Sequence, residues 1–172
     1  MTQVIQRAYP RVSCKAPIKY GISNGEKAAT QFFSSHTFNF SAGGICYETD
    51  QVLTPEEEVC IIMNNYAPGH SGPECYRSYL ARIRWTQRLS RKRKERFATG
   101  ALIIARSHEV LDVSTEAPRH NCDLCGALMV ACHLQCTDEN AQLCEQCHKH
   151  FLSLPKGKVR QCLERFLAGN VV

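Results

Sequence analysis

Asn39-Phe40-Ser41-Ala42-Gly43-Gly44 is the stretch that decides the fold, because short alternations of polar and apolar residues flank its glycines. Residues 37–40 and 45–47 alternate about the Ser-Ala-Gly-Gly break, which predicts two strands joined by a tight turn. Arg7-Ala8-Tyr9-Pro10-Arg11 lies about one hairpin upstream. An Arg-x-x-x-Arg pattern arises easily by chance here, and Arg84/Arg88 is a second copy. The Asn-x-Ser-x-x-Gly pattern is expected only roughly 0.04 times at this composition, so it carries more weight.

Further short segments extend the prediction of β-structure on both sides of this stretch. Residues 59–63, 80–86 and 97–105 read as strands, and residues 21–25, Gly-Ile-Ser-Asn-Gly, read as a turn. Short strands at this spacing predict an antiparallel barrel, so the fold class is mainly β.

One of these segments also predicts the position of the single tryptophan. Ala81, Ile83 and Trp85 fall on one face of the 80–86 strand, opposite Arg82 and Arg84. We therefore expect Trp85 in the barrel core rather than as an exposed stacking platform.

The two patterns together resemble the RxxxR and [D/N]xSxxG motifs of the PilZ domain, the bacterial receptor for cyclic di-GMP. The resemblance runs from about Val4 to Val113. It implies a PilZ-type antiparallel β-barrel that binds cyclic di-GMP and catalyses no reaction. By this similarity the ligand would be contacted by Arg7, Arg11, Asn39, Ser41 and Gly44.

The residue types match the chemistry of that ligand. Cyclic di-GMP has two phosphodiester anions and two guanine edges, and each O6/N7 pair fits the planar fork of a guanidinium. The family implies that Arg7 and Arg11 contact phosphate and guanine from above, while residues 39–44 meet the ligand from the barrel surface. Asn39 stands where many members have Asp, which removes a charged acceptor and bears on affinity. An ordinary polar turn over residues 39–44 is the alternative interpretation.

A second set of residues predicts a metal centre near the C-terminus. Cys122-Asp-Leu-Cys125 and Cys144-Glu-Gln-Cys147 are two CxxC hooks separated by 18 residues, the spacing of a structural zinc site. Gly126 allows the tight turn of a zinc knuckle after the second cysteine. Four protein ligands leave no open coordination position, so catalysis at the zinc is not expected.

Several alternatives for this metal centre stay open. Cys132 and Cys136 offer a second pair that can replace one hook, and His120, His148 and His150 are further nitrogen donors. Four thiolates also suit iron. A thioredoxin-like redox role is disfavoured because no βαβ pattern surrounds either hook.

The residues around the hooks predict a small α+β zinc module over residues 118–172, separate from the barrel of residues 1–115. Residues 128–140 indicate a hairpin, residues 147–152 a short helix, and the whole resembles a treble clef or zinc ribbon. An amphipathic C-terminal helix follows, which we expect to pack on the zinc module or to bind a partner. Its apolar positions are Val159, Cys162, Leu163, Phe166 and Leu167.

The positive charge of the chain is concentrated in one run. Residues 1–115 hold 15 Lys or Arg and 10 Asp or Glu, whereas residues 116–172 hold six of each. The run at 82–96 contains Arg82, Arg84, Arg88, Arg91, Lys92, Arg93, Lys94 and Arg96, with Glu95 as its single acid. A solvated loop is the ordinary interpretation. Contact with nucleic acid or another anionic partner, or steering of the ligand, is the functional one.

Composition limits the remaining possibilities. With 44% hydrophobic residues the chain can form packed cores, and it has neither an 18-residue apolar segment nor an apolar signal peptide. We therefore expect a soluble cytoplasmic protein without a membrane span, whose cysteines are thiols, and the family resemblance implies a bacterial one. The scattered cysteines are expected to be small buried residues: Cys14, Cys46, Cys60, Cys75 and Cys162.

Three functions follow from the sequence, and none is enzymatic, because we find no phosphate loop or catalytic constellation. The favoured one is a cyclic di-GMP receptor that signals through its zinc module or a protein partner. The alternatives are a nucleic-acid-associated zinc protein that uses residues 82–96, and a PilZ-like adaptor that binds no ligand.

Overall fold

The alternating segments of the sequence form the strands of a barrel. The computed structural model describes residues 9–23, 29, 31–89, 95–111 and 118–169. The barrel region contains β1 (Val12–Ser13), β2 (Pro17–Ser23), β3 (Phe33–Ser41), β4 (Gly44–Thr49), β5 (Glu58–Met63), β6 (Ser78–Leu89) and β7 (Arg96–Ser107). A 3₁₀ turn at Pro73–Cys75 precedes β6. The predictions of strands at residues 37–40, 45–47, 59–63, 80–86 and 97–105 are confirmed.

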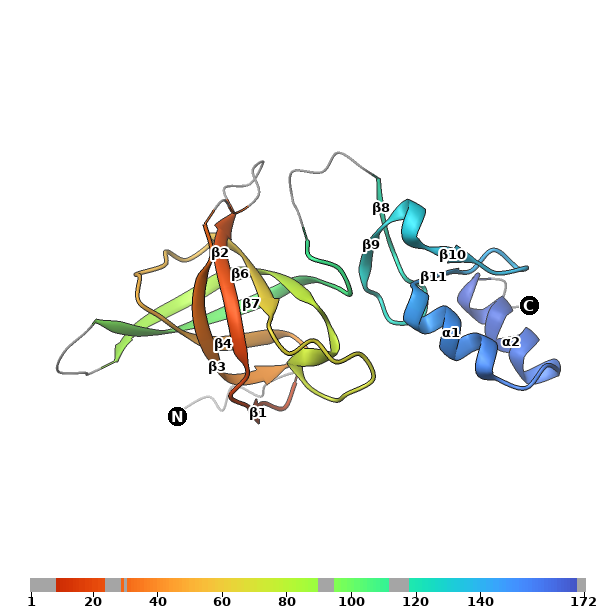
Figure 1. The fold of residues 1–172 in the computed structure, drawn as a ribbon, viewed down its shortest axis with the longest axis horizontal. Coiled ribbons are helices and arrows are strands. Elements are labelled where there is room, and N and C mark those ends of the chain that lie inside the picture. Colours follow the sequence, from red (N-terminus) through yellow and green to blue (C-terminus); the bar gives the residue numbers. More distant parts are fainter. Residues whose placement is uncertain (1–8, 24–28, 30, 90–94, 112–117, 170–172) are drawn as a thin grey trace, which may run out of the picture.

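The strands close on themselves (Figure 1). Their order is β1-β3-β2-β5-β6-β7-β4, and an additional β3–β4 pairing completes a six-stranded antiparallel ring. Closure leaves no unpaired sheet edge in the ring, which removes a site for aggregation. The short β1 pairs with the end of β3, so that Val12 lies opposite Phe40 and Ser13 opposite Asn39.

The barrel interior is filled by the inward-facing residues of these strands. Ile18, Tyr20, Tyr47, Tyr79 and Ile83 are buried, and the Tyr20 and Tyr47 rings lie 5.3 Å apart. Burial of each large apolar side chain contributes about 1.5–3 kcal/mol to folding. The buried residues of the C-terminal module, which include Cys122 and Cys144, form a second core.

The structure corrects the first part of the turn predicted at residues 21–25, because β2 continues through Gly21 to Ser23, and residues 24–25 lie outside the described residues. A Cβ added at Gly21 would lie 2.6 Å from the Ala29 Cβ and 2.8 Å from the Gln31 carbonyl oxygen. Glycine is therefore needed within the strand to allow close approach of the neighbouring chain, and not to make a turn.

The prediction that Trp85 belongs to the core is wrong. The register of β6 against β7 shifts between Ile83 and Trp85, which indicates a β-bulge. A bulge inserts an extra residue and reverses the inside-outside alternation beyond it. Ile83 is buried, whereas Trp85 is 37% exposed on the outer surface of the barrel.

The helices of the C-terminal module are as predicted, but the hairpin predicted over residues 128–140 is not: residues 128–130 pair with residues 119–121, and residues 135–136 pair with residues 142–143 across the turn at 137–140. It contains β8 (Arg119–Asn121), β9 (Leu128–Val130), a 3₁₀ turn at Ala131–His133, β10 (Gln135–Cys136), β11 (Gln142–Leu143), α1 (Glu145–Ser153) and α2 (Lys158–Leu167). β8 pairs with β9 and β10 with β11. The two α-helices that the structure describes lack the length and apolar character needed to traverse a bilayer.

Helix α2 packs on the module through only part of its apolar stripe. Leu163 and Leu167 pack against the core around Phe151, as predicted. Cys162 and Phe166 are exposed, so the prediction of a buried Cys162 is wrong. Glu164 faces the module instead, because its carboxylate accepts a 3.1 Å hydrogen bond from the Glu139 backbone N–H.

Candidate ligand pocket and metal centre

The pairing of β1 with β3 brings the N-terminal arginine motif to the Asn-x-Ser-x-x-Gly motif. Arg11 directly precedes Val12, which lies opposite Phe40, so Arg11 reaches the Ser41 end of β3. Arg7 lies outside the described residues. The two halves of the sequence pattern therefore meet at one place on the barrel, although only one of the two arginines can be located.

A pocket of about 480 Å³ is present where they meet. Its volume is within the range of small-molecule sites. Four of the five residues expected to contact ligand line it, namely Arg11, Asn39, Ser41 and Gly44. The other lining residues are Tyr9, Gly43, Ile45, Cys46, Arg84, Trp85, Gly100, Ala101 and Leu102.

Trp85 forms part of the pocket because the opposite strand carries a glycine. A Cβ added at Gly100 would lie 2.2 Å from Trp85 Cε2 and 2.3 Å from its Nε1. The indole therefore lies directly against the backbone of β7, and no larger residue fits at Gly100. The indole of Trp85 is therefore an exposed aromatic surface that lines the pocket together with Arg84 and Arg11. Sequence alternation alone had predicted this side chain in the core.

The two adjacent glycines of the motif have distinct structural roles. A Cβ at Gly43 would approach the Tyr9 ring to 3.0 Å, so Gly43 makes room for the N-terminal arm. A Cβ at Gly44 would lie 3.1 Å from the Ala101 carbonyl oxygen. Gly44 therefore allows β4 to pack against β7 and also contributes open backbone to the pocket.

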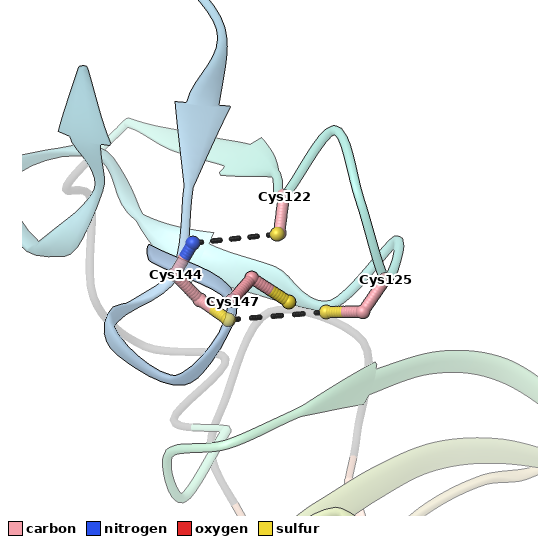
Figure 2. Close-up of side chains that lie close together, drawn as sticks. All are labelled: Cys122, Cys125, Cys144 and Cys147. Carbon is pink, nitrogen blue, oxygen red and sulfur yellow. Dashed lines mark hydrogen bonds between the residues drawn. The ribbon is translucent and has the colours of Figure 1, made fainter. Parts of the chain in front are cut away.

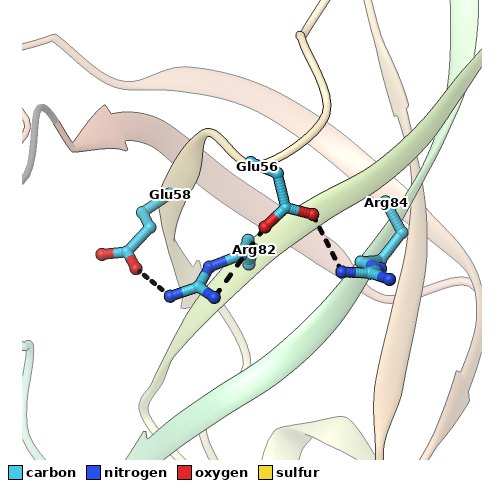
Figure 3. A network of polar contacts seen from close by, with 4 residues as sticks. All are labelled: Glu56, Glu58, Arg82 and Arg84. Carbon is cyan, nitrogen blue, oxygen red and sulfur yellow. Dashed lines mark hydrogen bonds and ion pairs between the residues drawn. The ribbon is translucent and has the colours of Figure 1, made fainter.

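The basic run is compensated by acids from other parts of the chain (Figure 3). Arg82 lies 2.9 Å from Glu58, and Arg84 lies 2.9 Å from Glu56. The run also pairs Arg88 with Glu95 at 2.5 Å and Arg96 with Glu48 at 3.2 Å. Exposed pairs add only about 0–1 kcal/mol to stability, but they reduce the local positive potential. Residues 91–94 lie outside the described residues.

The two CxxC hooks converge on one point in the C-terminal module (Figure 2). The sulfur atoms of Cys122, Cys125, Cys144 and Cys147 all lie within 4.8 Å of one another. Cys125 Sγ and Cys144 Sγ are 3.9 Å apart. A tetrahedral Zn–S distance of about 2.3 Å corresponds to a sulfur separation of about 3.8 Å, so the cluster has the dimensions of a four-thiolate metal site.

The local backbone positions these sulfurs. Gly126 has φ 69°, a left-handed conformation that favours glycine, and its N–H donates to the Cys122 carbonyl oxygen at 2.8 Å. The Cys144 N–H donates to Cys122 Sγ at 3.3 Å, immediately before α1 begins. The first hook is therefore a tight knuckle, and the second hook lies at a helix start.

The four thiols share protons in a way that favours a cation. Hydrogen bonding with Cys125 lowers the pKa of Cys122 to about 6. Hydrogen bonding with Cys122 also lowers the pKa of Cys144, and it raises the pKa values of Cys125 and Cys147. Four sulfurs this close cannot all be thiolates without a cation between them.

Metal binding should release about four protons at neutral pH, because the thiols of the unfolded, metal-free module have an ordinary pKa of about 8.5 and metal ligands must be deprotonated. Affinity should rise with pH and fall as acid protonates the sulfurs. Calorimetric titration with zinc in buffers of different ionisation enthalpy measures the number of protons. Cys132→Ser is the matched control and should release the same number. Release of no protons would contradict binding through thiolates.

The alternative donors do not join the described cluster. Cys132 and Cys136 are exposed. Cys136 Sγ contacts Asn140, and His133 pairs with Glu109. Among the described residues, only the two hooks come together as a group of three or more possible metal ligands.

Sequence reasoning missed several residues that the fold brings to these sites. Arg84, Trp85 and Gly100 line the pocket but lie outside the two motifs that predicted the site, and Tyr9 is a variable position within the first motif. The register of β6 against β7 brings Arg84, Trp85 and Gly100 to the pocket, and this register depends on a bulge in β6 that the alternation of polar and apolar residues does not reveal. His108 was also missed, although its ring lies 3.8 Å from Cys125 Sγ.

Comparison with known proteins gives a family for the barrel. A model of the PilZ domain matches residues 5–114. Among solved structures, the inhibitor of motility MotI/DgrA of Bacillus subtilis is similar, with 15% sequence identity and a TM-score of 0.43. That match covers 62% of this chain and 46% of the other. No curated protein matches the sequence.

Proposed function

Because the chain belongs to the PilZ domain family of cyclic di-GMP receptors, we propose that it is a non-enzymatic receptor that binds cyclic di-GMP in the pocket around Arg11. The convergence of Arg11, Asn39, Ser41 and Gly44 on one pocket is the observation that supports this proposal. The family motifs come from segments about thirty residues apart, and strand pairing alone brings them together.

Each group in the pocket has a role that suits this ligand. The guanidinium of Arg11, joined by Arg7, binds a guanine O6/N7 edge or a phosphate in a bidentate manner. The Asn39 amide and the Ser41 hydroxyl supply neutral donors and acceptors for polar edges of the ligand. The Trp85 indole offers a flat apolar surface on which a guanine base stacks.

The C-terminal module is proposed to bind one structural zinc ion through Cys122, Cys125, Cys144 and Cys147, with no coordination position open for catalysis. Strand β7 gives a direct structural connection between the two sites. Its middle residues Gly100 and Leu102 line the pocket, and its end leads into His108 beside Cys125. We propose that ligand binding alters the surface that the module presents to a protein partner.

Calorimetric titration of the zinc-loaded chain with cyclic di-GMP tests the receptor function, with cyclic di-AMP as the control. Adenine has a donor at N6 where guanine has an acceptor at O6, so cyclic di-AMP should bind much more weakly. Equal binding of both would indicate recognition of phosphate alone. No binding of either would leave the ligand-free adaptor as the better account.

Replacing Trp85 should weaken the receptor without unfolding it, because the indole lies on the barrel surface. We expect Trp85→Ala to reduce cyclic di-GMP affinity roughly 5- to 100-fold, the usual contribution of one stacked base. Phe32→Ala is the matched control, since Phe32 is also exposed (39%) but is not among the pocket residues. Equal affinities of the two variants, measured by calorimetry, would exclude stacking on Trp85.

A further inference from the structure

The cysteine cluster lies directly against the end of β7, and we infer that the barrel residues Tyr76, Arg106 and His108 form the outer shell of the metal centre. This inference rests on the proposed occupation of the four cysteines by zinc. It assigns residues of the receptor barrel to the metal site itself, so that the affinity for metal depends on both parts of the chain.

His108 is oriented toward a ligand sulfur by a second barrel residue. The Tyr66 hydroxyl lies 3.1 Å from His108 Nδ1, and His108 Nε2 lies 3.8 Å from Cys125 Sγ. We infer that the Tyr66 hydroxyl donates to Nδ1 of His108, which leaves Nε2, the ring nitrogen that faces Cys125, to carry a proton and donate a hydrogen bond to the sulfur.

Tyr76 fixes both the histidine and the backbone of the knuckle. Its ring stacks on the His108 ring, with centroids 4.9 Å apart and planes inclined by 27°. Its hydroxyl donates to the Cys125 carbonyl oxygen at 3.2 Å. A single side chain therefore restrains Cys125 in two ways.

Arg106 adds the charge that a four-thiolate site requires. Its guanidinium lies 5.0 Å from the Tyr76 ring centroid. One of its terminal nitrogens is 3.6 Å from the position that a Cβ on Gly126 would occupy. Four thiolates around one divalent zinc carry a net charge of −2, and a fixed cation beside the knuckle offsets part of it.

Two further contacts hold the module in this position. Ser107 Oγ donates to Met129 Sδ at 3.7 Å, and Glu109 pairs with His133. These contacts come from the same stretch that follows the middle of β7. Tyr76 and His108 have a different role, because their donor groups face a proposed metal ligand: the Tyr76 hydroxyl faces the Cys125 carbonyl oxygen, and His108 faces the Cys125 sulfur. Outer-shell groups of this kind orient the ligands and stabilise the bound metal.

The test uses the full zinc-loaded chain and compares His108→Phe with His36→Phe. Phenylalanine keeps an aromatic ring on Tyr76 but removes the donor to Cys125, and His36 is an exposed residue of β3. We expect His108→Phe to transfer zinc to a chromophoric chelator about 10-fold faster than wild type. The control should match wild type. Equal rates for the two variants would overturn the inference.

Cobalt provides a readout that simple loss of packing would not change. Loss of the hydrogen bond to Cys125 should make the sulfur more electron-rich and shift the sulfur-to-cobalt charge-transfer band to lower energy. Tyr76→Phe, which removes one oxygen atom, should also speed zinc release even if His108→Phe folds poorly. Unchanged release in Tyr76→Phe and an unchanged cobalt spectrum in His108→Phe would both count against the outer shell. Failure of wild type to bind zinc or cobalt would instead refute the metal site.

Discussion

Removal of zinc from the proposed site is expected to unfold residues 118–169 while the barrel stays folded. The module's buried core is small and includes two of the metal ligands, Cys122 and Cys144. In units of this size the metal-binding energy, about 10–16 kcal/mol for structural zinc, serves as folding energy. The barrel core of Ile18, Tyr79 and Ile83 does not depend on these contacts. Hydrogen exchange before and after chelation should show loss of protection across residues 118–169, in β8 to β11 as well as in α1 and α2, with the barrel strands unchanged.

Cysteine variants sharpen this prediction. Cys144→Ser should have the same effect as chelation, because it removes one ligand from the cluster. Cys132→Ser and Cys136→Ser are the matched controls, since both cysteines are exposed and stand apart from the cluster. They should bind one zinc ion and keep the wild-type exchange pattern. A chelated chain with unchanged protection across residues 118–169 would refute a structural metal.

Replacing either arginine of the N-terminal motif should weaken cyclic di-GMP binding about 10- to 100-fold. Loss of a charge-assisted contact costs about 1.5–3 kcal/mol, which corresponds to that change in dissociation constant. Arg11→Ala tests the arginine that lines the pocket, and Arg7→Ala tests its motif partner. Arg11→Lys keeps the charge but loses the bidentate fork, so it should also bind more weakly than wild type.

Arg88→Ala is the control for these variants, because Arg84/Arg88 is a chance copy of the same spacing. Arg88 pairs with Glu95 and is not among the pocket residues. Its affinity should remain that of wild type. Wild-type affinity in both Arg7→Ala and Arg11→Ala, measured by calorimetry, would reject the assigned site.

Much of the fold was predictable because local pattern and tertiary structure agree. Alternation predicted β3 to β7 apart from their exact ends, and CxxC spacing predicted a cluster that the structure brings within 4.8 Å. Gly126 was identified as a turn residue, and its φ of 69° confirms it. These features depend on residues close together in the sequence or on the fixed spacing of metal ligands, and both can be recognised in one amino-acid sequence.

The errors come from features set by distant partners. Trp85 was misplaced because a bulge interrupts the alternation of β6. The ion pairs of the basic run with Glu48, Glu56 and Glu58 were not predicted, because these acids approach the run only after the barrel closes. The place of His108 beside Cys125 depends on how the module meets the barrel, and no spacing in the sequence encodes it.

Intrinsic fluorescence tests the central claim most directly, because Trp85 is the only tryptophan of the chain and lines the proposed pocket. Titration of the zinc-loaded chain with cyclic di-GMP, corrected for absorption by the nucleotide, should quench this emission in a saturable manner as guanine stacks on the indole. Cyclic di-AMP at the same concentrations should produce a much smaller change, and Arg11→Ala should move the midpoint to higher concentration. Emission that stays constant up to saturating cyclic di-GMP, or that responds equally to both nucleotides, would contradict a guanine-reading receptor site at this pocket.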